Sequence, residues 1–158
     1  MCGRPEGATL TTIGLKKRKK GCPIAFRMLH DTKKQEIMLK WLINDTEVVK
    51  KALHHSFLIN ESEILELDRI QTSILEEDVE LRLIQPFFSN KGWKFLEKAV
   101  KMKRKREIWI CPKCNLDIGS KNSILCDSCL LWYHTKCEIK LKSRDKNCNW
   151  FCSMCSTK

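Results

Sequence analysis

The chain has 158 residues, of which 42% are hydrophobic, and it carries a formal net charge of +11. No apolar run approaches the roughly 18 residues of a membrane-spanning helix, and the polar, basic N-terminal segment is unlike a secretory signal peptide. We therefore expect a cytosolic or nuclear protein without a membrane partner, in which ten cysteines indicate metal binding rather than disulfides. This positive charge favours acidic partners.

Residues 1–30 are predicted to form a disordered basic tail, because glycines and prolines recur there without an apolar period. The tail contains five consecutive cations, which are Lys16, Lys17, Arg18, Lys19 and Lys20. Such a run is typical of a nuclear import signal or of an arm that binds phosphates. A simply solvated run of charges is the alternative.

Residues 31–104 are predicted to form a small helical region of four or five helices. Thr32 and Gln35 have the spacing of a capping box at the start of the first helix. Asn44 and Asp45 end that helix and cap a second one, whose apolar stripe reaches Phe57. The aliphatic residues between Ile64 and Leu75 recur at helical spacing and predict a third helix.

Two further helices complete this region in the prediction. Residues 79–85 form a short one that stops at Pro86. Ser89 caps the last, where Trp93, Leu96 and Val100 form a stripe. Cations crowd the end of that helix from Lys98 to Arg106. Cations at a helix C-terminus interact favourably with the helix dipole, so these residues require no binding partner, although contact with phosphates is an alternative.

The C-terminal cysteines are spaced as metal ligands. Two residues separate the members of each of four ligand pairs, a spacing that lets both members reach one tetrahedral Zn²⁺ at ~2.3 Å. Eight ligands make two closed four-coordinate sites without an open position for water, so both zinc ions are predicted to be structural and we expect no catalytic residues. The ligands are Cys111, Cys114, Cys126, Cys129, His134, Cys137, Cys152 and Cys155.

With cysteine as the fourth ligand and histidine as the fifth, residues 108–156 resemble the PHD finger. Trp150, Asp127 and the sequence Trp132-Tyr133-His134 support the resemblance. Cys148 is an additional cysteine. Residues 143–149, which read SRDKNCN, lack the proline-glycine turn with which the family holds the amino terminus of its ligand.

The resemblance implies a short two-stranded sheet and an interleaved, cross-braced arrangement of the two zinc sites. Apolar residues in this segment are too few for a stable core, so we expect zinc to provide most of the folding free energy. The implied first site contains Cys111, Cys114, His134 and Cys137, and the implied second site contains Cys126, Cys129, Cys152 and Cys155.

The resemblance also implies recognition of a histone H3 tail or another peptide, which would pair with the strand Ser123-Ile124-Leu125. Trp132 stands where methyl-lysine readers carry a cage tryptophan, but the other cage positions, Ile110, Ile118 and Ser123, are not aromatic. An unmodified lysine would instead need a carboxylate, and the candidates are Asp117 and Asp127.

Two alternatives remain open at this point. RING ubiquitin ligases also have a cross-brace, although most have histidine as their fourth ligand. A looser resemblance, carried by Gly3-Arg4-Pro5 and by Leu83-Ile84 with Phe87-Phe88, is to proteins associated with transposable elements that end in a PHD-like finger. It implies a DNA-associated accessory role. We expect a zinc-dependent nuclear, chromatin-associated binding module, neither an enzyme nor a receptor for small-molecule substrates.

Overall fold

A computed structural model describes residues 23–106, 108–138 and 149–156. The described chain forms two compact units, Phe26–Trp109 and a C-terminal unit that begins at Ile110. The Lys16–Lys20 run and most of the 143–149 segment lie outside the described residues. In the part of the chain that is described, no helix is long and apolar enough to cross a membrane.

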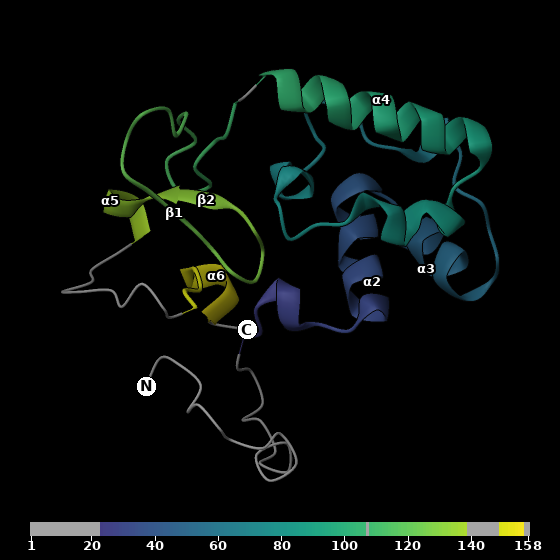
Figure 1. The fold of residues 1–158 in the computed structure, drawn as a ribbon, viewed down its shortest axis with the longest axis horizontal. Coiled ribbons are helices and arrows are strands. Elements are labelled where there is room, and N and C mark those ends of the chain that lie inside the picture. Colours follow the sequence, from purple (N-terminus) through teal and green to yellow (C-terminus); the bar gives the residue numbers. More distant parts are fainter. Residues whose placement is uncertain (1–22, 107, 139–148, 157–158) are drawn as a thin grey trace, which may run out of the picture. The chain divides into compact units, whose positions relative to one another are not determined.

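The first unit is helical and begins before residue 31. Phe26 is buried, and its ring lies 5.3 Å from the Trp41 ring, so the expected disordered tail does not extend to residue 30. The elements follow in the order η1 (Phe26–Met28), α2 (Asp31–Leu42), α3 (Thr46–His54), η2 (Glu61–Glu63), η3 (Thr72–Leu75), η4 (Leu81–Phe87) and α4 (Asn90–Arg106) (Figure 1).

The predicted capping box at the start of α2 does not form. His30 occupies the N-cap without a side-chain hydrogen bond. The Gln35 amide instead donates to the Leu83 carbonyl at 2.8 Å, which joins α2 to η4. Asp45 caps α3 as expected and accepts from the Glu47 N–H. That helix ends sooner than its apolar stripe suggests, because Ser56 has a φ of 53°.

The predicted third helix, between residues 64 and 75, is wrong. Ile64 forms an isolated antiparallel bridge with Ile43, and the Leu65 N–H donates to the Leu42 carbonyl. The N–H groups of Leu65 and Gln71 bond to carbonyls at the end of α2 instead of to carbonyls four residues earlier. The aliphatic side chains of this segment lie on irregular chain and a 3-10 turn, and most of them are buried, whereas Leu65 and Leu67 are half-buried. Likewise η4 continues through Pro86 to Phe87 instead of stopping before the proline.

Helix α4 is the longest element and lies along one side of this unit (Figure 1). Its first turn is capped as predicted, because the Ser89 hydroxyl accepts from the Gly92 N–H at 3.1 Å. Trp93, Leu96 and Val100 are buried, as their spacing predicts. At the far end Lys103 donates to the Leu67 carbonyl, which holds the irregular segment against the helix.

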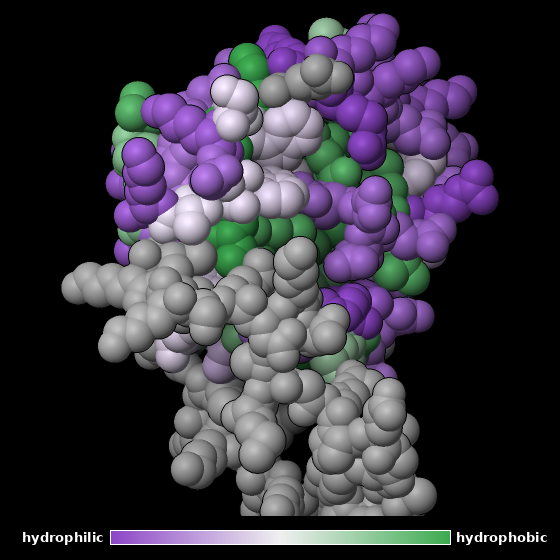
Figure 2. All heavy atoms as spheres, turned by 60° about the vertical axis from the view of Figure 1, so that its left-hand side comes forward, coloured by the Kyte–Doolittle hydropathy of each residue, from purple (hydrophilic) through white to green (hydrophobic). Residues whose placement is uncertain are grey.

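The C-terminal unit contains a two-stranded antiparallel sheet, as the sequence predicts. Strands β1 (Ser123–Leu125) and β2 (Trp132–His134) are followed by two helical turns, α5 (Thr135–Glu138) and α6 (Ser153–Ser156). Ile124 and Tyr133 lie opposite each other and are buried, and the Tyr133 ring meets Trp150 edge-on at 5.9 Å. Among the residues that are coloured in Figure 2, hydrophilic ones predominate on the face drawn.

Candidate metal centre

The C-terminal unit brings the eight predicted ligands into two groups of four. In each group the ligand atoms all lie within 4.8 Å of one another. One group is Cys111, Cys114, His134 and Cys137, and the other is Cys126, Cys129, Cys152 and Cys155. These are the same sets that the family resemblance implies, with ligand pairs alternating between the two groups along the chain.

The distances within the groups suit zinc. Tetrahedral bonds of ~2.3 Å to sulfur and ~2.0 Å to nitrogen place two sulfurs about 3.8 Å apart, and a sulfur and a nitrogen about 3.5 Å apart. The Cys129 and Cys152 sulfurs are 3.9 Å apart. His134 Nδ1 lies 3.2 Å from the Cys114 sulfur and 3.8 Å from the Cys137 sulfur. Both groups thus have the donor set and the size of a closed structural zinc site.

The first pair of each group lies on a tight loop of the same design. The Asn115 N–H donates to the Cys111 carbonyl at 2.8 Å, and the Leu130 N–H donates to the Cys126 carbonyl at 2.9 Å. Asn115 and Leu130, each directly after the second cysteine, have φ angles of 59° and 55°. This left-handed residue reverses the chain so that both cysteines of the pair face one point.

The second pair of each group lies at a helical turn, and this turn also supports the first pair. The His134 N–H donates to the Cys111 sulfur at 3.5 Å, and the Cys152 N–H donates to the Cys126 sulfur at 3.3 Å. The two sites are therefore built alike. Each N–H stabilises negative charge on a sulfur, which favours the thiolate that zinc requires.

A backbone carbonyl orients the histidine ligand. His134 Nε2 lies 3.0 Å from the carbonyl oxygen of Asp117. Since a carbonyl oxygen only accepts hydrogen bonds, Nε2 carries the proton and Nδ1 keeps the lone pair that faces the thiols. The ring is 95% buried, so its orientation is fixed before metal binds.

The thiols of the second group differ in acidity. Contact with the Cys129 thiol, helped by nearby N–H groups, lowers the pKa of Cys126 to about 5. The same contact raises the pKa of Cys129, and burial raises the pKa of Cys155 to about 11. One thiolate thus forms readily in this group, while Cys129 and Cys155 ionise only when a cation compensates their charge.

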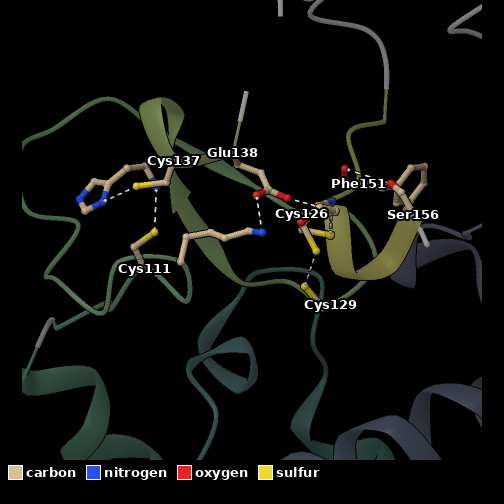
Figure 3. Close-up of polar contacts among 11 residues, drawn as sticks. Cys111, Cys126, Cys129, Cys137, Glu138, Phe151 and Ser156 are labelled. Atoms are coloured by element: carbon tan, nitrogen blue, oxygen red, sulfur yellow. Dashed lines mark hydrogen bonds and ion pairs between the residues drawn. The ribbon is translucent and has the colours of Figure 1, made fainter. Parts of the chain in front are cut away.

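Glu138 connects the two groups, and sequence reasoning missed it. Its side chain is 3% exposed, lies 3.5 Å from the Lys113 ammonium on the first loop, and accepts from the Ser153 N–H at the start of α6. Figure 3 shows it between Cys137 and Cys111 on one side and Cys126 on the other. An acidic residue directly after a ligand was its only sequence signal.

The predicted peptide-binding strand has one free edge in the described chain. Cys126 N–H donates to the Leu131 carbonyl, and Thr135 N–H donates to the Asn122 carbonyl. In this register the backbone groups of Ser123 and Leu125 point away from β2. Among the described residues, none forms a backbone hydrogen bond with either of these two.

The other three residues predicted to contact a peptide differ in exposure and in their hydrogen bonds. Trp132 lies opposite Leu125 and is partly exposed. Asp117 is exposed, and one of its carboxylate oxygens accepts from the Gly119 N–H. Asp127 accepts from the Trp150 N–H at 2.6 Å and donates its own N–H back to the Trp150 carbonyl, which makes it a structural link.

Comparison with known proteins agrees with this architecture. A family model of the PHD finger matches residues 115–155. The C-terminal unit is a PHD finger. Subunit 3 of transcription initiation factor TFIID from mouse is 38% identical to this chain over 52 residues, which cover 33% of this chain and 6% of the mouse protein. The corresponding protein of Xenopus laevis has the same identity and coverage. No solved structure matches the chain.

The PHD finger accounts for the two clusters, which are sites for two structural zinc ions. The chain spans only a small part of the length of the TFIID subunits that it matches. Their similarity concerns a segment about as long as the finger, and the helical unit is not explained by it.

Proposed function

We propose that this protein is a zinc-dependent, nuclear and chromatin-associated binding module whose PHD finger recognises a histone H3 tail or another extended peptide. The observation that carries the proposal is the outer edge of β1. There the outward N–H and C=O groups of Ser123 and Leu125 have no partner among the described residues. An extended peptide can add to such an edge as a third strand.

A charged and an aromatic side chain in the same unit as this edge support a basic peptide. The exposed carboxylate of Asp117 and the indole of Trp132 belong to the same unit as the strand. A lysine side chain can pair with the first and lie against the second. Ile118 is buried and Ile110 is aliphatic, so the proposed site lacks the ring faces of a full methyl-lysine cage. We therefore expect only a weak preference for methylated lysine.

The relatives support a nuclear location. Both are subunits of a transcription initiation factor by name, and transcription initiation is a nuclear process in animals. The high net charge of +11 is consistent with an acidic chromatin environment. We further propose that the finger binds rather than catalyses, since its two closed clusters use all four ligand positions for protein side chains.

An NMR titration of the 158-residue, zinc-loaded chain with histone H3 tail peptides tests the proposal. We expect shifts at Ser123 and Leu125 with the unmodified peptide, and a slightly larger response at the Trp132 indole with the trimethylated one. Trp132→Ala should weaken binding of both peptides. Leu116→Ala removes a side chain that is 59% exposed in the same unit and serves as the matched control.

The outcomes separate the alternatives. Shifts confined to residues outside β1 would contradict strand addition. No shifts with either peptide would contradict the histone proposal. Ubiquitin transfer by the zinc-loaded protein, in the presence of activating and conjugating enzymes, would contradict the proposal that the finger is not an enzyme.

A further inference from the structure

The solvent face of α4 carries an uninterrupted stripe of lysines. They recur every three or four residues, which places them on one side of a helix with 3.6 residues per turn. The opposite side holds the buried residues Trp93, Leu96 and Val100. The five lysines of the stripe are all exposed, and no described residue makes a hydrogen bond or an ion pair with any of them. The lysine stripe consists of Lys91, Lys94, Lys98, Lys101 and Lys105.

Other cations of the same helix have internal roles. Lys103 donates to the Leu67 carbonyl at 2.9 Å, and Arg104 donates to the Leu75 carbonyl at 3.3 Å. Arg106 pairs with Asp68 at 2.5 Å. These three stabilise the helical unit itself, so they do not explain why the lysine stripe is present.

An apolar groove borders the lysine stripe along one edge. It has a volume of about 250 Å³ and is lined by Leu65, Leu67, Phe95, Lys98, Ala99 and Met102. Phe95 is 41% exposed and Met102 is 47% exposed, two turns apart along the same helix. Exposed apolar side chains that adjoin one another commonly mark a binding surface. Glu97 is the only carboxylate within α4, and its helical position lies beyond the stripe on the side away from the groove.

We propose that this surface binds an acidic amphipathic helix of another protein. The apolar side chains of such a helix would enter the groove between Phe95 and Met102, and its carboxylates would face the lysine stripe. From Lys91 to Lys105 the stripe is about 21 Å long at the ordinary rise of an α-helix, enough for about four turns of a partner. Opposite charge would speed association, and the groove would provide affinity and register.

The groove is the reason to favour a peptide over nucleic acid. A phosphate backbone needs cations but gains nothing from an apolar groove beside them. A helix with acidic and apolar faces uses both features. This inference concerns the helical unit and is independent of the function proposed for the PHD finger.

Fluorescence anisotropy with the 158-residue, zinc-loaded chain tests the proposal. The probe is a labelled synthetic 20-residue peptide with leucine and phenylalanine at helical spacing and glutamate or aspartate elsewhere. We expect binding that weakens at least tenfold when the apolar residues of the peptide are replaced by serine. We also expect the variants Met102→Ser and Lys98→Glu to bind the original peptide with an affinity at least tenfold lower.

Matched variants control for folding and for general charge. Leu58→Ser removes a side chain of the same unit that is 51% exposed and lies outside the groove. Lys51→Glu changes an exposed lysine on α3. Both should bind the probe like the original protein, and thermal unfolding checks that every variant is folded.

Three results would overturn the proposal. One is no binding of the amphipathic peptide. Another is equal binding of the peptide without apolar residues. The third is tighter binding of a 20-base-pair DNA duplex than of the peptide, with no effect of Met102→Ser, which would make the lysine stripe a surface for phosphates.

Discussion

Glu138 is the residue on which the connection between the two zinc sites depends. It follows the ligand Cys137 directly, and its buried carboxylate contacts Lys113 of the first loop and the backbone of Ser153 beside Cys152. A carboxylate in this place connects the first group, to which the Lys113 loop and Cys137 belong, with α6 of the second group, a connection that neither zinc ion makes. It therefore complements the metal rather than repeating its role.

Replacing Glu138 should destabilise the zinc-loaded finger. We expect Glu138→Ala to lower the free energy of unfolding by about 1–3 kcal/mol, because the Ser153 N–H and the Lys113 ammonium lose a charged acceptor. Glu138→Gln should lower the free energy of unfolding by less, since the glutamine side chain retains an acceptor for the Ser153 N–H. Urea denaturation followed by NMR signals of the finger measures both, with the exposed Lys136→Ala as control. Equal stability of Glu138→Ala and Lys136→Ala would refute this role.

At the residue scale, the sequence predicted those features of the site that depend only on residues close together in the chain. Cys111 and Cys114 can meet one ion because two residues separate them, whatever the rest of the chain does. Glu138 acquires its role only after distant segments fold against it. Asp127, expected as a possible peptide contact, exchanges hydrogen bonds with Trp150, which is 23 residues away along the chain. No local pattern contains that information.

At the scale of elements, α4 depends on a glycine in its first turn. A Cβ at Gly92 would lie 2.4 Å from the carbonyl oxygen of Ile59 and 3.3 Å from the Asn60 Cα. That carbonyl already accepts from the Ser89 N–H. The helix can approach the preceding chain this closely only because residue 92 has no side chain.

Gly92→Ala should therefore destabilise the helical unit, although alanine is the better helix former by about 1 kcal/mol. We expect a net loss of about 1–3 kcal/mol, the usual cost of forcing extra atoms into a packed site. Thermal unfolding followed by the fluorescence of the buried Trp41 and Trp93 measures it. Lys91→Ala, at the neighbouring exposed position, is the control. A Gly92→Ala protein of unchanged or higher melting temperature would contradict the close approach.

Helix prediction succeeded where local signals agreed and was wrong where they conflicted with tertiary hydrogen bonds. Ser89 and Asp45 both cap the helices they precede, since a cap involves only residues within one turn. Between Ile64 and Leu75 the apolar period is helical, but N–H groups there bond to the end of α2. Periodicity identified most of the buried side chains there but could not reveal which backbone groups would pair.

At the scale of the whole molecule, the two units differ in what stabilises them. The helical unit buries a continuous set of large apolar side chains, including Met38, Leu39, Ile59 and Leu96, each less than 2% exposed. The PHD finger buries few, and its ligand groups occupy much of its interior. The first unit can fold on hydrophobic burial, whereas the second needs its ions.

Removal of zinc should accordingly unfold one unit and leave the other intact. We expect excess chelator to collapse the amide dispersion of the finger, including Tyr133 and Ile124, while residues such as Leu39 and Leu96 keep their native chemical shifts. Structural zinc contributes about 10–16 kcal/mol in finger peptides, more than so small a core supplies. Two-dimensional NMR before and after chelation, with zinc quantified by atomic absorption, measures the effect. A finger that remains dispersed without zinc would disprove the dependence.

The alternation of ligand pairs along the chain also sets an order of events during synthesis. The four ligands of the first group are all present once Cys137 has left the ribosome, while the second group waits for Cys155. A growing chain can thus capture one ion before it can capture the other. Until then Cys126 and Cys129 lack the other two ligands of their site, and the Glu138 carboxylate lacks the hydrogen bond from the Ser153 N–H. A ribosome that pauses between these points would hold a half-metallated finger, with the exposed thiols of Cys126 and Cys129 as its chemically vulnerable part.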